Sequence, residues 1–331
     1  MRKLIHSLVF VICLATSLAY AAGTGLGAGF RVVELNDPVA QKVMKAAVFY
    51  PTEENNGPTK MGPLEIAAMK DASVRRGRYP LVLLSHGNGG SMFSHQDIAS
   101  ALAKHGFVVA AIEHPGDNFR DESGLGTDRV LIGRNLQLTA LLDFLLANPA
   151  FAPFLDPAKV GVAGFSAGGY TALLMVGANP KFDLLKDFCA LSPSSVICAG
   201  GGEVLVSSPP LVAKADARVR AAFVMSPVAA FFDQDSLVGI SVPVYVYAAA
   251  NDSVLPIQGN ALRVSKALRT LTKYSEVPSA DHFVFLSPCT SQMKSITPSL
   301  CMDPPGVERH TVHETLIRDA AAFFRAHLNG F

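Results

Sequence analysis

The sequence has little net charge, no basic run and no internal repeat. Its 331 residues include 28 Lys and Arg against 27 Asp and Glu, and only 17% of the residues are charged. A nearly neutral chain offers no positive field to a phosphate backbone, so no nucleic-acid partner is expected. Half of the residues are hydrophobic, which excludes a disordered chain, and the absence of a linker favours one large domain.

Long apolar runs are absent except at the N-terminus. A basic start at Arg2 and Lys3 precedes an apolar run that ends at Leu18, and small residues follow. This pattern is typical of a secretory signal peptide. We therefore expect residues 1–21 to be removed and residues 22–331 to be exported, to the periplasm or the medium. An uncleaved anchor is the alternative, although the run is short for a membrane span. No stable membrane span is expected in the mature chain.

Cysteines are few, and none lies in a CxxC motif or beside a histidine pair, which argues against a metal site. Four of the five cysteines remain in the mature chain, as two pairs that are local in sequence. An oxidising compartment permits disulfides. Sequence proximity favours Cys189–Cys198 and Cys289–Cys301 among the three possible pairings.

Apolar strands alternate with helices along the mature chain. Strands are predicted at residues 30–35, 45–50, 81–84, 107–112, 160–165, 221–225, 242–248 and 274–278. Helices are predicted at residues 94–104, 131–145, 167–176, 257–269 and 311–328. Ser94 with Asp97, and Thr311 with Glu314, are spaced as capping boxes for two of them. The alternation predicts an α/β fold whose mostly parallel central sheet is covered by helices on both faces. Reactive side chains should then follow the carboxyl ends of strands.

A serine stands in a glycine-rich turn between a predicted strand and the helix after it. The motif runs from Gly164 through Ser166 to Gly168 and has the pattern G-x-S-x-G. In this strand–turn–helix context the serine backbone is forced into a sparsely populated conformation, and the glycines let strand and helix approach each other. The motif therefore predicts that Ser166 is a nucleophile.

A serine hydroxyl needs a base, and the base needs an orienting acid. His282 follows the last predicted strand and lies downstream of the serine, so it is the candidate base. Asp252 follows the preceding strand and is the candidate acid. Asp233 and Asp235, which follow the strand before that, are the rival acids. Such a triad needs neither a metal nor an organic cofactor.

A second glycine-rich turn, from His86 to Gly90, follows the predicted strand 81–84. The N–H of Asn88 and that of Ala167, the residue after the serine, are the candidate donors to an oxyanion. The turn lacks the lysine and the spacing of a phosphate-binding loop. His86 is expected to pack behind the turn rather than to act as a base.

Residues 181–218 do not follow the strand–helix alternation. They contain the first cysteine pair and show little periodicity. An insertion after the helix of the nucleophile would form a lid that shapes substrate choice; a surface excursion without a role is the alternative. The second cysteine pair follows His282, and its disulfide would stiffen the loop that carries this histidine.

These motifs resemble the α/β-hydrolase superfamily, and more closely an exported group of dienelactone-hydrolase-like proteins related to the platelet-activating-factor acetylhydrolases. The resemblance rests on residues 83–90 and 105–117 and on the loops of Ser166, Asp252 and His282, and it spans nearly the whole mature chain. It implies the α/β-hydrolase fold, with an inserted lid-like segment, and an ester hydrolase with the residue roles given above.

Two features depart from the group. Dienelactone hydrolases use a cysteine nucleophile where Ser166 stands, so a lactone substrate is not implied. The acetylhydrolases place their acid one strand earlier, where this chain has Ser226 and Pro227. Asp252 instead fits the general hydrolase plan. The segment from His114 to Asp117 is shared with the group and is expected to be loop architecture beside the pocket.

We therefore expect a secreted serine carboxylester hydrolase that cleaves short-acyl esters through an acyl-enzyme intermediate, with a small-molecule or lipid ester as substrate. A phospholipase A2-like acetylhydrolase acting on platelet-activating-factor-like phospholipids is the alternative among enzymes. A binding protein on a catalytically dead hydrolase scaffold is the alternative outside them, disfavoured because serine, histidine and acid are all present. The sequence makes no prediction about the oligomeric state.

Overall fold

The structure is a computed structural model that describes residues 25–54, 57–191, 193, 196–198 and 201–328, so the predicted signal peptide lies outside the described residues. Each predicted strand is present. The strands are β1 (Gly27–Asn36), β2 (Val43–Thr52), β3 (Thr59–Met61), β4 (Leu64–Ile66), β5 (Met69–Lys70), β6 (Tyr79–Ser85), β7 (Val108–Glu113), β8 (Leu155–Phe165), β9 (Val219–Met225), β10 (Val244–Ala249) and β11 (Leu271–Val277).

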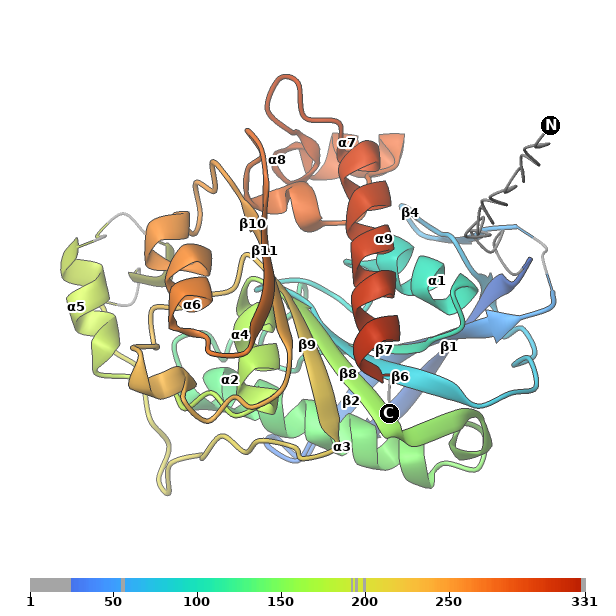
Figure 1. The fold of residues 1–331 in the computed structure, drawn as a ribbon, viewed down its shortest axis with the longest axis horizontal. Helices are drawn as coiled ribbons and strands as arrows, with labels where there is room; N and C mark the ends of the chain where they lie inside the picture. The colour runs from blue at the N-terminus through green and yellow to red at the C-terminus, as the bar shows by residue number, and fades with distance from the viewer. Residues whose placement is uncertain (1–24, 55–56, 192, 194–195, 199–200, 329–331) are drawn as a thin grey trace, which may run out of the picture.

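Nine of these strands form one twisted sheet, in the order β11-β10-β9-β8-β6-β7-β2-β1-β5 (Figure 1). The strands from β6 to β11 pair in parallel, whereas β2 is antiparallel to both of its neighbours. The predicted α/β fold with a mostly parallel sheet is therefore confirmed. Because parallel strands end at one edge, the loops after β6, β8, β10 and β11 come together there.

The helices begin at other residues than the capping patterns predict. They are α1 (Gln96–Lys104), α2 (Asp128–Leu131), α3 (Gly133–Ala147), α4 (Ala167–Met175), α5 (Leu184–Leu191), α6 (Ala261–Ala267), α7 (Ser291–Ile296), α8 (Pro298–Cys301) and α9 (Arg309–Leu328). The Ser94 hydroxyl accepts from the Ser91 N–H (2.9 Å) and not from α1. Because α9 already begins at Arg309, Thr311 does not precede it. Both predicted capping boxes are wrong.

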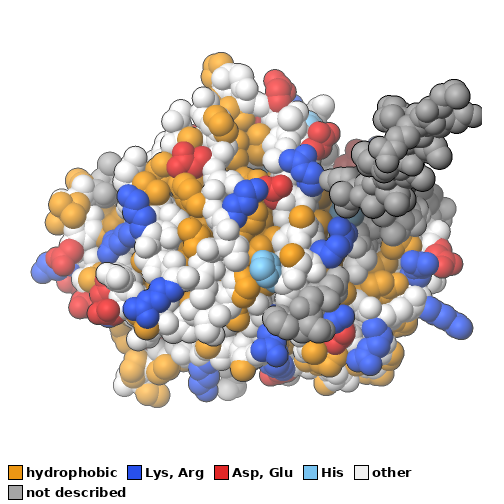
Figure 2. All heavy atoms as spheres, viewed as in Figure 1, with side chains coloured by type: hydrophobic (Ala, Val, Ile, Leu, Met, Phe, Trp, Pro, Cys, Tyr) orange, Lys and Arg blue, Asp and Glu red, His pale blue; other side chains and the backbone are white. Residues whose placement is uncertain are grey.

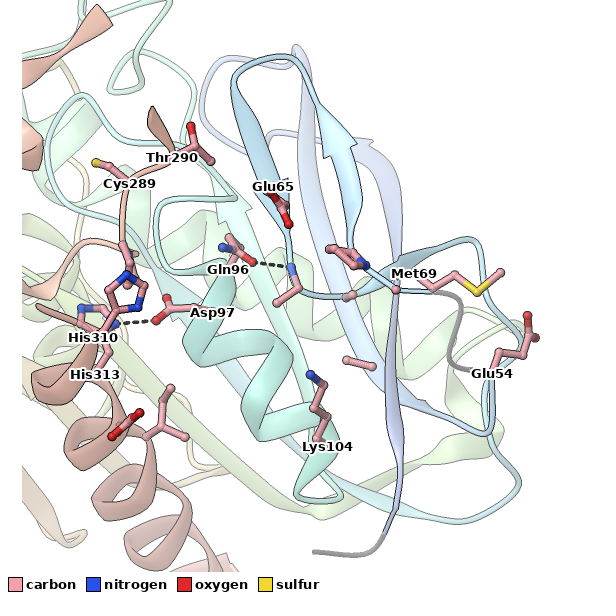
Figure 3. Close-up of a pocket in the computed structure, with 18 residues that line it drawn as sticks. Glu54, Glu65, Met69, Gln96, Asp97, Lys104, Cys289, Thr290, His310 and His313 are labelled. Atoms are coloured by element: carbon pink, nitrogen blue, oxygen red, sulfur yellow. Dashed lines mark hydrogen bonds and ion pairs between the residues drawn. The ribbon is translucent and has the colours of Figure 1, made fainter. Parts of the chain in front are cut away.

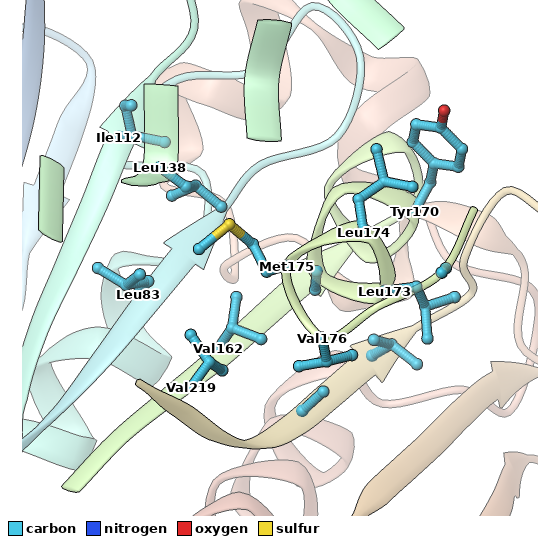
Figure 4. Close-up of a cluster of buried hydrophobic side chains, with 14 of the residues drawn as sticks. Leu83, Ile112, Leu138, Val162, Tyr170, Leu173, Leu174, Met175, Val176 and Val219 are labelled. Carbon is cyan, nitrogen blue, oxygen red and sulfur yellow. The ribbon is translucent and has the colours of Figure 1, made fainter. Parts of the chain in front are cut away.

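Helices cover both faces of the sheet, and alternate residues of a strand pack against opposite layers. In β6, Leu81 and Leu83 join the cluster beneath α3, α4 and α6. Val82 and Leu84 join the cluster beneath α1 and α9. Figure 4 shows the first cluster, where Met175 of α4 meets side chains of the strands. Burying each such side chain contributes about 1.5–3 kcal/mol, so the continuous apolar runs follow from two-sided burial.

One helical stretch, residues 128–147, is long and apolar enough to cross a membrane by length and composition, contrary to the expectation that no later stretch would be. Its most apolar window is 56% buried inside the protein, where α3 packs against α4 and the sheet. It also carries Arg134, which is fully buried. The stretch is therefore a core helix of the domain.

On the face drawn in Figure 2, described side chains of both charges are interspersed.

The segment 181–218 leaves the core after α4 and returns at β9. Its first part contains α5, and its later part runs along α2 and α3. There the Leu205 N–H donates to Gly126 O (2.8 Å), and the main chain of Lys214 exchanges hydrogen bonds with the Asn135 side chain (2.8 and 3.0 Å). A lid function for this segment stays a prediction.

Both predicted disulfides are present. Cys189–Cys198 joins α5 to the short 3-10 helix η2 (Val196–Cys198), and its Cα atoms are 5.5 Å apart. Cys289–Cys301 encloses α7, with Cα atoms 5.7 Å apart. The second bridge closes the segment that follows η5 (His282–Phe285), the short 3-10 helix that begins at the predicted base.

The first turn of α4 lies unusually close to the end of β6. A Cβ added at Gly168 would lie 1.9 Å from the carbonyl oxygen of Ser85 and 2.6 Å from that of His86. Both neighbours are backbone atoms, which cannot rotate away as a flexible side chain could. Glycine is therefore required here by close approach.

We expect Gly168→Ala to lower the free energy of unfolding by about 3 kcal/mol, the upper part of the range for overpacking, because strand and helix must separate. Urea unfolding of both proteins measures this. The matched control is Gly259→Ala, whose added Cβ would meet only a Phe188 ring carbon at 3.4 Å. Equal stability of the Gly168 variant and the wild type would contradict the close-approach argument.

Candidate active site

Ser166 follows β8 directly and has a backbone conformation that L-residues rarely adopt, with φ 55° and ψ −118°. Such a residue costs about 1–3 kcal/mol and persists only where its surroundings hold it. Its N–H donates to Met225 O (2.9 Å), and its carbonyl accepts from the Val228 N–H (3.2 Å). These bonds to the end of β9 and the loop after it fix the turn. The strain predicted for the G-x-S-x-G turn is therefore present.

The three predicted triad side chains meet at the carboxyl edge of the sheet. The Ser166 Oγ lies 3.0 Å from His282 Nε2, and His282 Nδ1 lies 2.7 Å from Asp252 Oδ2. All three residues are buried. When the Nδ1–H donates to the carboxylate, Nε2 is left to accept the serine proton. The arrangement has the order and reach of a nucleophile, a base and an orienting acid.

The loops that carry the acid and the base are tied to each other. Asp252 Oδ1 accepts from the N–H groups of Val254 (3.1 Å) and Leu255 (2.6 Å), which orients Oδ2 toward the imidazole. Asp281 accepts from the N–H of Ser253 (2.8 Å) and also from that of His282 (2.7 Å). The Asp281 side chain, which belongs to the loop after β11, thus ties that loop to the loop after β10.

The rival acids lie elsewhere. Asp233 forms an ion pair with Lys181 (2.5 Å) and accepts from the N–H and hydroxyl of Ser236. The bond from Lys181 lowers the pKa of the Asp233 carboxyl below its usual value. Asp235 begins the 3-10 helix η3 (Asp235–Leu237). Within the part of the chain that the structure describes, neither carboxylate contacts His282, so the geometry favours Asp252.

The glycine-rich turn after β6 passes beside the serine. A Cβ added at Gly87 would lie 3.3 Å from the Ser166 Cβ. Ala167 is the first residue of α4, so its N–H has no acceptor within the helix. Among the described residues, neither this N–H nor that of Asn88 has a hydrogen-bond partner. The turn that carries Asn88 thus lies beside the start of α4, and the oxyanion-hole role of these two N–H groups stays a prediction.

His86 lies behind the turn, where the sequence places it. Its Nδ1 lies 2.6 Å from Gly87 O and its Nε2 accepts from the His114 N–H (3.1 Å), so Nδ1 carries the proton. Burial and the nearby Arg134 guanidinium lower the pKa of His86 to about 3. The ring is therefore neutral and supports the turn.

Two further histidines hold the segment that begins at His282. The His95 Nδ1 is 2.9 Å from the carbonyl oxygen of Phe285, and the His313 Nε2 is 2.8 Å from that of Val284. Both accepting carbonyls belong to η5, the turn that starts at the base. Each imidazole therefore donates to this turn, one from the start of α1 and one from α9.

His313 also forms a buried ion pair with Asp97, shown in Figure 3 beside a cavity of about 600 Å³. The Nδ1–Oδ2 distance is 2.5 Å, and the Ser287 hydroxyl bonds the other carboxylate oxygen (2.5 Å). Burial opposes the charge on His313, but Asp97 outweighs it and raises the pKa of His313 above 6.5. Burial likewise opposes the Asp97 charge, yet His313 and Ser287 lower the pKa of Asp97 to about 2. Each group therefore favours the charged form of the other.

The sequence patterns indicated neither His95 nor His313 as a support of η5. Asp97 was expected to cap α1, whereas it binds His313, which is 216 positions away in the chain. The contact depends on the packing of α1 beside α9 on one face of the sheet, and no local sequence pattern predicts that packing. A polar residue on a buried helix face is the only local signal that His313 gives.

We expect His313→Gln to lower the free energy of unfolding by about 2 kcal/mol near pH 6, the scale of hydrogen bonds to a charged group. The pKa of His313 is higher in the folded than in the unfolded chain, so its stabilisation is complete below about pH 6.5 and is lost as the pH rises through the folded-state pKa. At the acid end the contribution of Asp97 is lost as the pH falls toward its pKa of about 2.

Urea unfolding of wild type and variant from about pH 5 to about pH 10 measures this: the difference should shrink at alkaline pH. His95 and Arg309 also face His313 and remain unchanged in both proteins. The matched control is His310→Gln, since His310 is exposed on the same helix. A difference independent of pH would show that His313 acts by packing alone.

Comparisons with known proteins show which sequences part of this chain is similar to. The family model for platelet-activating factor acetylhydrolase, isoform II, matches residues 54–130. The platelet-activating factor acetylhydrolase of Cavia porcellus is 39% identical over 162 residues, which cover 37% of this chain and 37% of that protein. The Bos taurus protein of the same name is 37% identical over 71 residues, covering 19% and 16%. The aligned part thus spans well under half the length of these relatives.

Similarity to a solved structure extends over nearly the whole chain. The ferulic acid esterase from Streptomyces cinnamoneus superposes with a TM-score of 0.65 and 21% identity, covering 94% of this chain and 93% of that one. At this identity the likeness establishes the fold. The resemblance predicted from the motifs is confirmed: the chain has the α/β-hydrolase fold, and part of its sequence is similar to the platelet-activating factor acetylhydrolases.

Proposed function

We propose that this protein is a serine carboxylester hydrolase. The observation that carries the proposal is the hydrogen-bonded series from Asp252 through His282 to the Ser166 hydroxyl, with distances of 2.7 and 3.0 Å. The serine stands on a strained turn directly before the first residue of a helix, near two N–H groups that have no partner in the described chain. These are the parts that acyl transfer requires.

In the first half-reaction the Ser166 oxygen attacks the ester carbonyl carbon while His282 Nε2 takes the hydroxyl proton. The carbonyl oxygen becomes an anion, which the N–H groups of Asn88 and Ala167 would stabilise, each donor being worth about 3 kcal/mol. Collapse breaks the bond to the alkoxide, which leaves with the proton from His282. Water then attacks the acyl-serine by the same steps in reverse, releasing the acid and restoring the hydroxyl.

Short-acyl esters are the proposed substrates. A phospholipid bearing a short acyl group is the second candidate, supported by the similarity of residues 54–130 to a family of platelet-activating factor acetylhydrolases. Turnover of p-nitrophenyl esters from acetate to octanoate, compared with turnover of a phospholipid carrying a 2-acetyl group, separates the two. Preference for the phospholipid over every simple ester would favour the second candidate.

We expect Ser166→Ala to lower kcat for p-nitrophenyl acetate by about 10⁴-fold or more, because the nucleophile of the acyl-enzyme is removed. The matched control is Ser265→Ala, since Ser265 is also 7% exposed but lies on α6 and donates to Leu262 O. It should retain full turnover. A folded Ser166 variant with wild-type activity would refute the nucleophile assignment, and a fluorophosphonate label on any other residue would do the same.

We also propose that the protein is exported, supported by the N-terminal pattern and by two disulfides in the described chain. Expression of the full chain in a secreting host should give a mature protein that begins at residue 22. Intact mass and N-terminal sequencing measure this, and a thiol titration of the unfolded protein should find none. A retained N-terminus, or four free thiols per chain, would contradict export.

A further inference from the structure

Arg134 is a charged residue completely enclosed by the protein. It lies in the first turn of α3, and its side chain is 2% exposed. Its guanidinium donates to the Asp117 carboxylate, the carbonyl oxygen of His86, the Ser85 hydroxyl (3.1 Å) and the Thr171 hydroxyl (3.2 Å). Burying an ion costs several kcal/mol unless it is paired and hydrogen-bonded, and here each of the three guanidinium nitrogens donates at least one hydrogen bond. The proposed reaction steps do not use it.

Asp117, the partner carboxylate, is equally buried and binds the glycine-rich turn directly. One oxygen pairs with Arg134, and the other accepts from the Gly89 N–H (2.9 Å). Gly89 has a positive φ of 62°, so the turn adopts a conformation that needs to be held. The turn is therefore hydrogen-bonded on both sides of Asn88, to Asp117 through the Gly89 N–H and to Arg134 through the His86 carbonyl oxygen.

The same guanidinium also reaches the helix of the nucleophile. Thr171, which accepts from Arg134 Nε, donates its own proton to the carbonyl oxygen of Ala167 (2.8 Å). Asn88 and Ala167 are the two proposed oxyanion donors, one in the turn after β6 and the other at the start of α4. Arg134 is linked to both the turn and the helix through contacts of one planar group. A lysine ammonium could not span these acceptors, because it lacks the fixed fork of the guanidinium.

We propose that the buried Arg134–Asp117 pair positions the oxyanion hole, by fixing the turn of Asn88 relative to the first residue of α4. The proposal rests on the proposed function and deepens it. Both residues are positioning residues, since neither touches the reacting atoms. An oxyanion forms only after attack on the carbonyl, so a misplaced donor lowers kcat and leaves ground-state binding nearly unchanged.

A merely structural pair predicts a different result from a positioning pair. If the pair only balances charge, replacing both partners by neutral groups of similar shape relieves the unpaired charge and restores stability and activity together. If it positions the turn, the double replacement restores stability while activity stays low. The double variant Asp117→Asn with Arg134→Gln therefore separates the two roles.

The experiment measures kcat and KM for p-nitrophenyl acetate, and Tm, in D117N, in the double variant and in the wild type. We expect D117N to lower kcat by about 10- to 100-fold, below the roughly 10²- to 10³-fold loss for removing a donor outright, with KM nearly unchanged. The double variant should regain much of the lost Tm and keep the low kcat.

The matched control is Asp319→Asn, which breaks the ion pair of Asp319 in α9 with Lys273 in β11 (3.0 Å). It should lower Tm without lowering kcat. If D117N does not fold, Thr171→Val removes one acceptor of Arg134 and the bond to Ala167 at little change in volume. We then expect a kcat several-fold below that of the wild type, again with KM unchanged.

Unchanged kcat in folded D117N, or in T171V where D117N does not fold, would overturn the proposal. So would recovery of kcat together with Tm in the double variant. These outcomes are distinct from failure of the proposed function, because inactivity of the wild-type protein toward all esters, or full activity of S166A, would refute the hydrolase itself.

Discussion

The contact between the first turn of α4 and the end of β6 determines the geometry of the whole site. Gly168 brings that turn so close to Ser85 and His86 that no side chain fits between them. As a result the serine at the start of α4 and the glycine-rich turn at the end of β6 lie side by side. The strained backbone of Ser166 is a consequence, since the chain must leave β8 and enter the helix within one residue.

Much of the fold can be predicted from the sequence because strands buried on both faces of a parallel sheet consist of consecutive apolar residues. Strands β6, β7 and β10 are buried throughout, whereas the edge strand β11 is mostly half-buried or exposed. The loops after β8, β10 and β11 carry Ser166, Asp252 and His282. Only side chains in loops that directly follow parallel strands can meet at the carboxyl edge of the sheet, which limits the candidates. The rival acid Asp233 could be set aside only from coordinates, because its partner Lys181 lies in a segment without periodicity.

The contacts that hold these loops in place could not be predicted from local sequence patterns. Asp97 has the spacing of a helix cap, but its carboxylate is occupied by His313 from α9, and α1 begins without a side-chain cap. The predicted cap failed because tertiary pairing with a buried imidazole competes with local capping. Arg134 is similar: it breaks an apolar helix pattern, and only the fold shows that the loops after β6 and β7 supply its acceptors.

Buried polar groups thus hold each loop of the site from behind. His95 and His313 bind the turn that begins at His282, backbone N–H groups orient Asp252, and Arg134 with Asp117 grips the turn after β6. Because these bonds are inside the protein, their geometry does not depend on what occupies the mouth of the site. The described segment between α4 and β9 is different, since it exposes apolar side chains, among them Leu191, Leu205 and Val212. The geometry of the site therefore depends on the core, whereas we expect the segment between α4 and β9 to influence substrate selection.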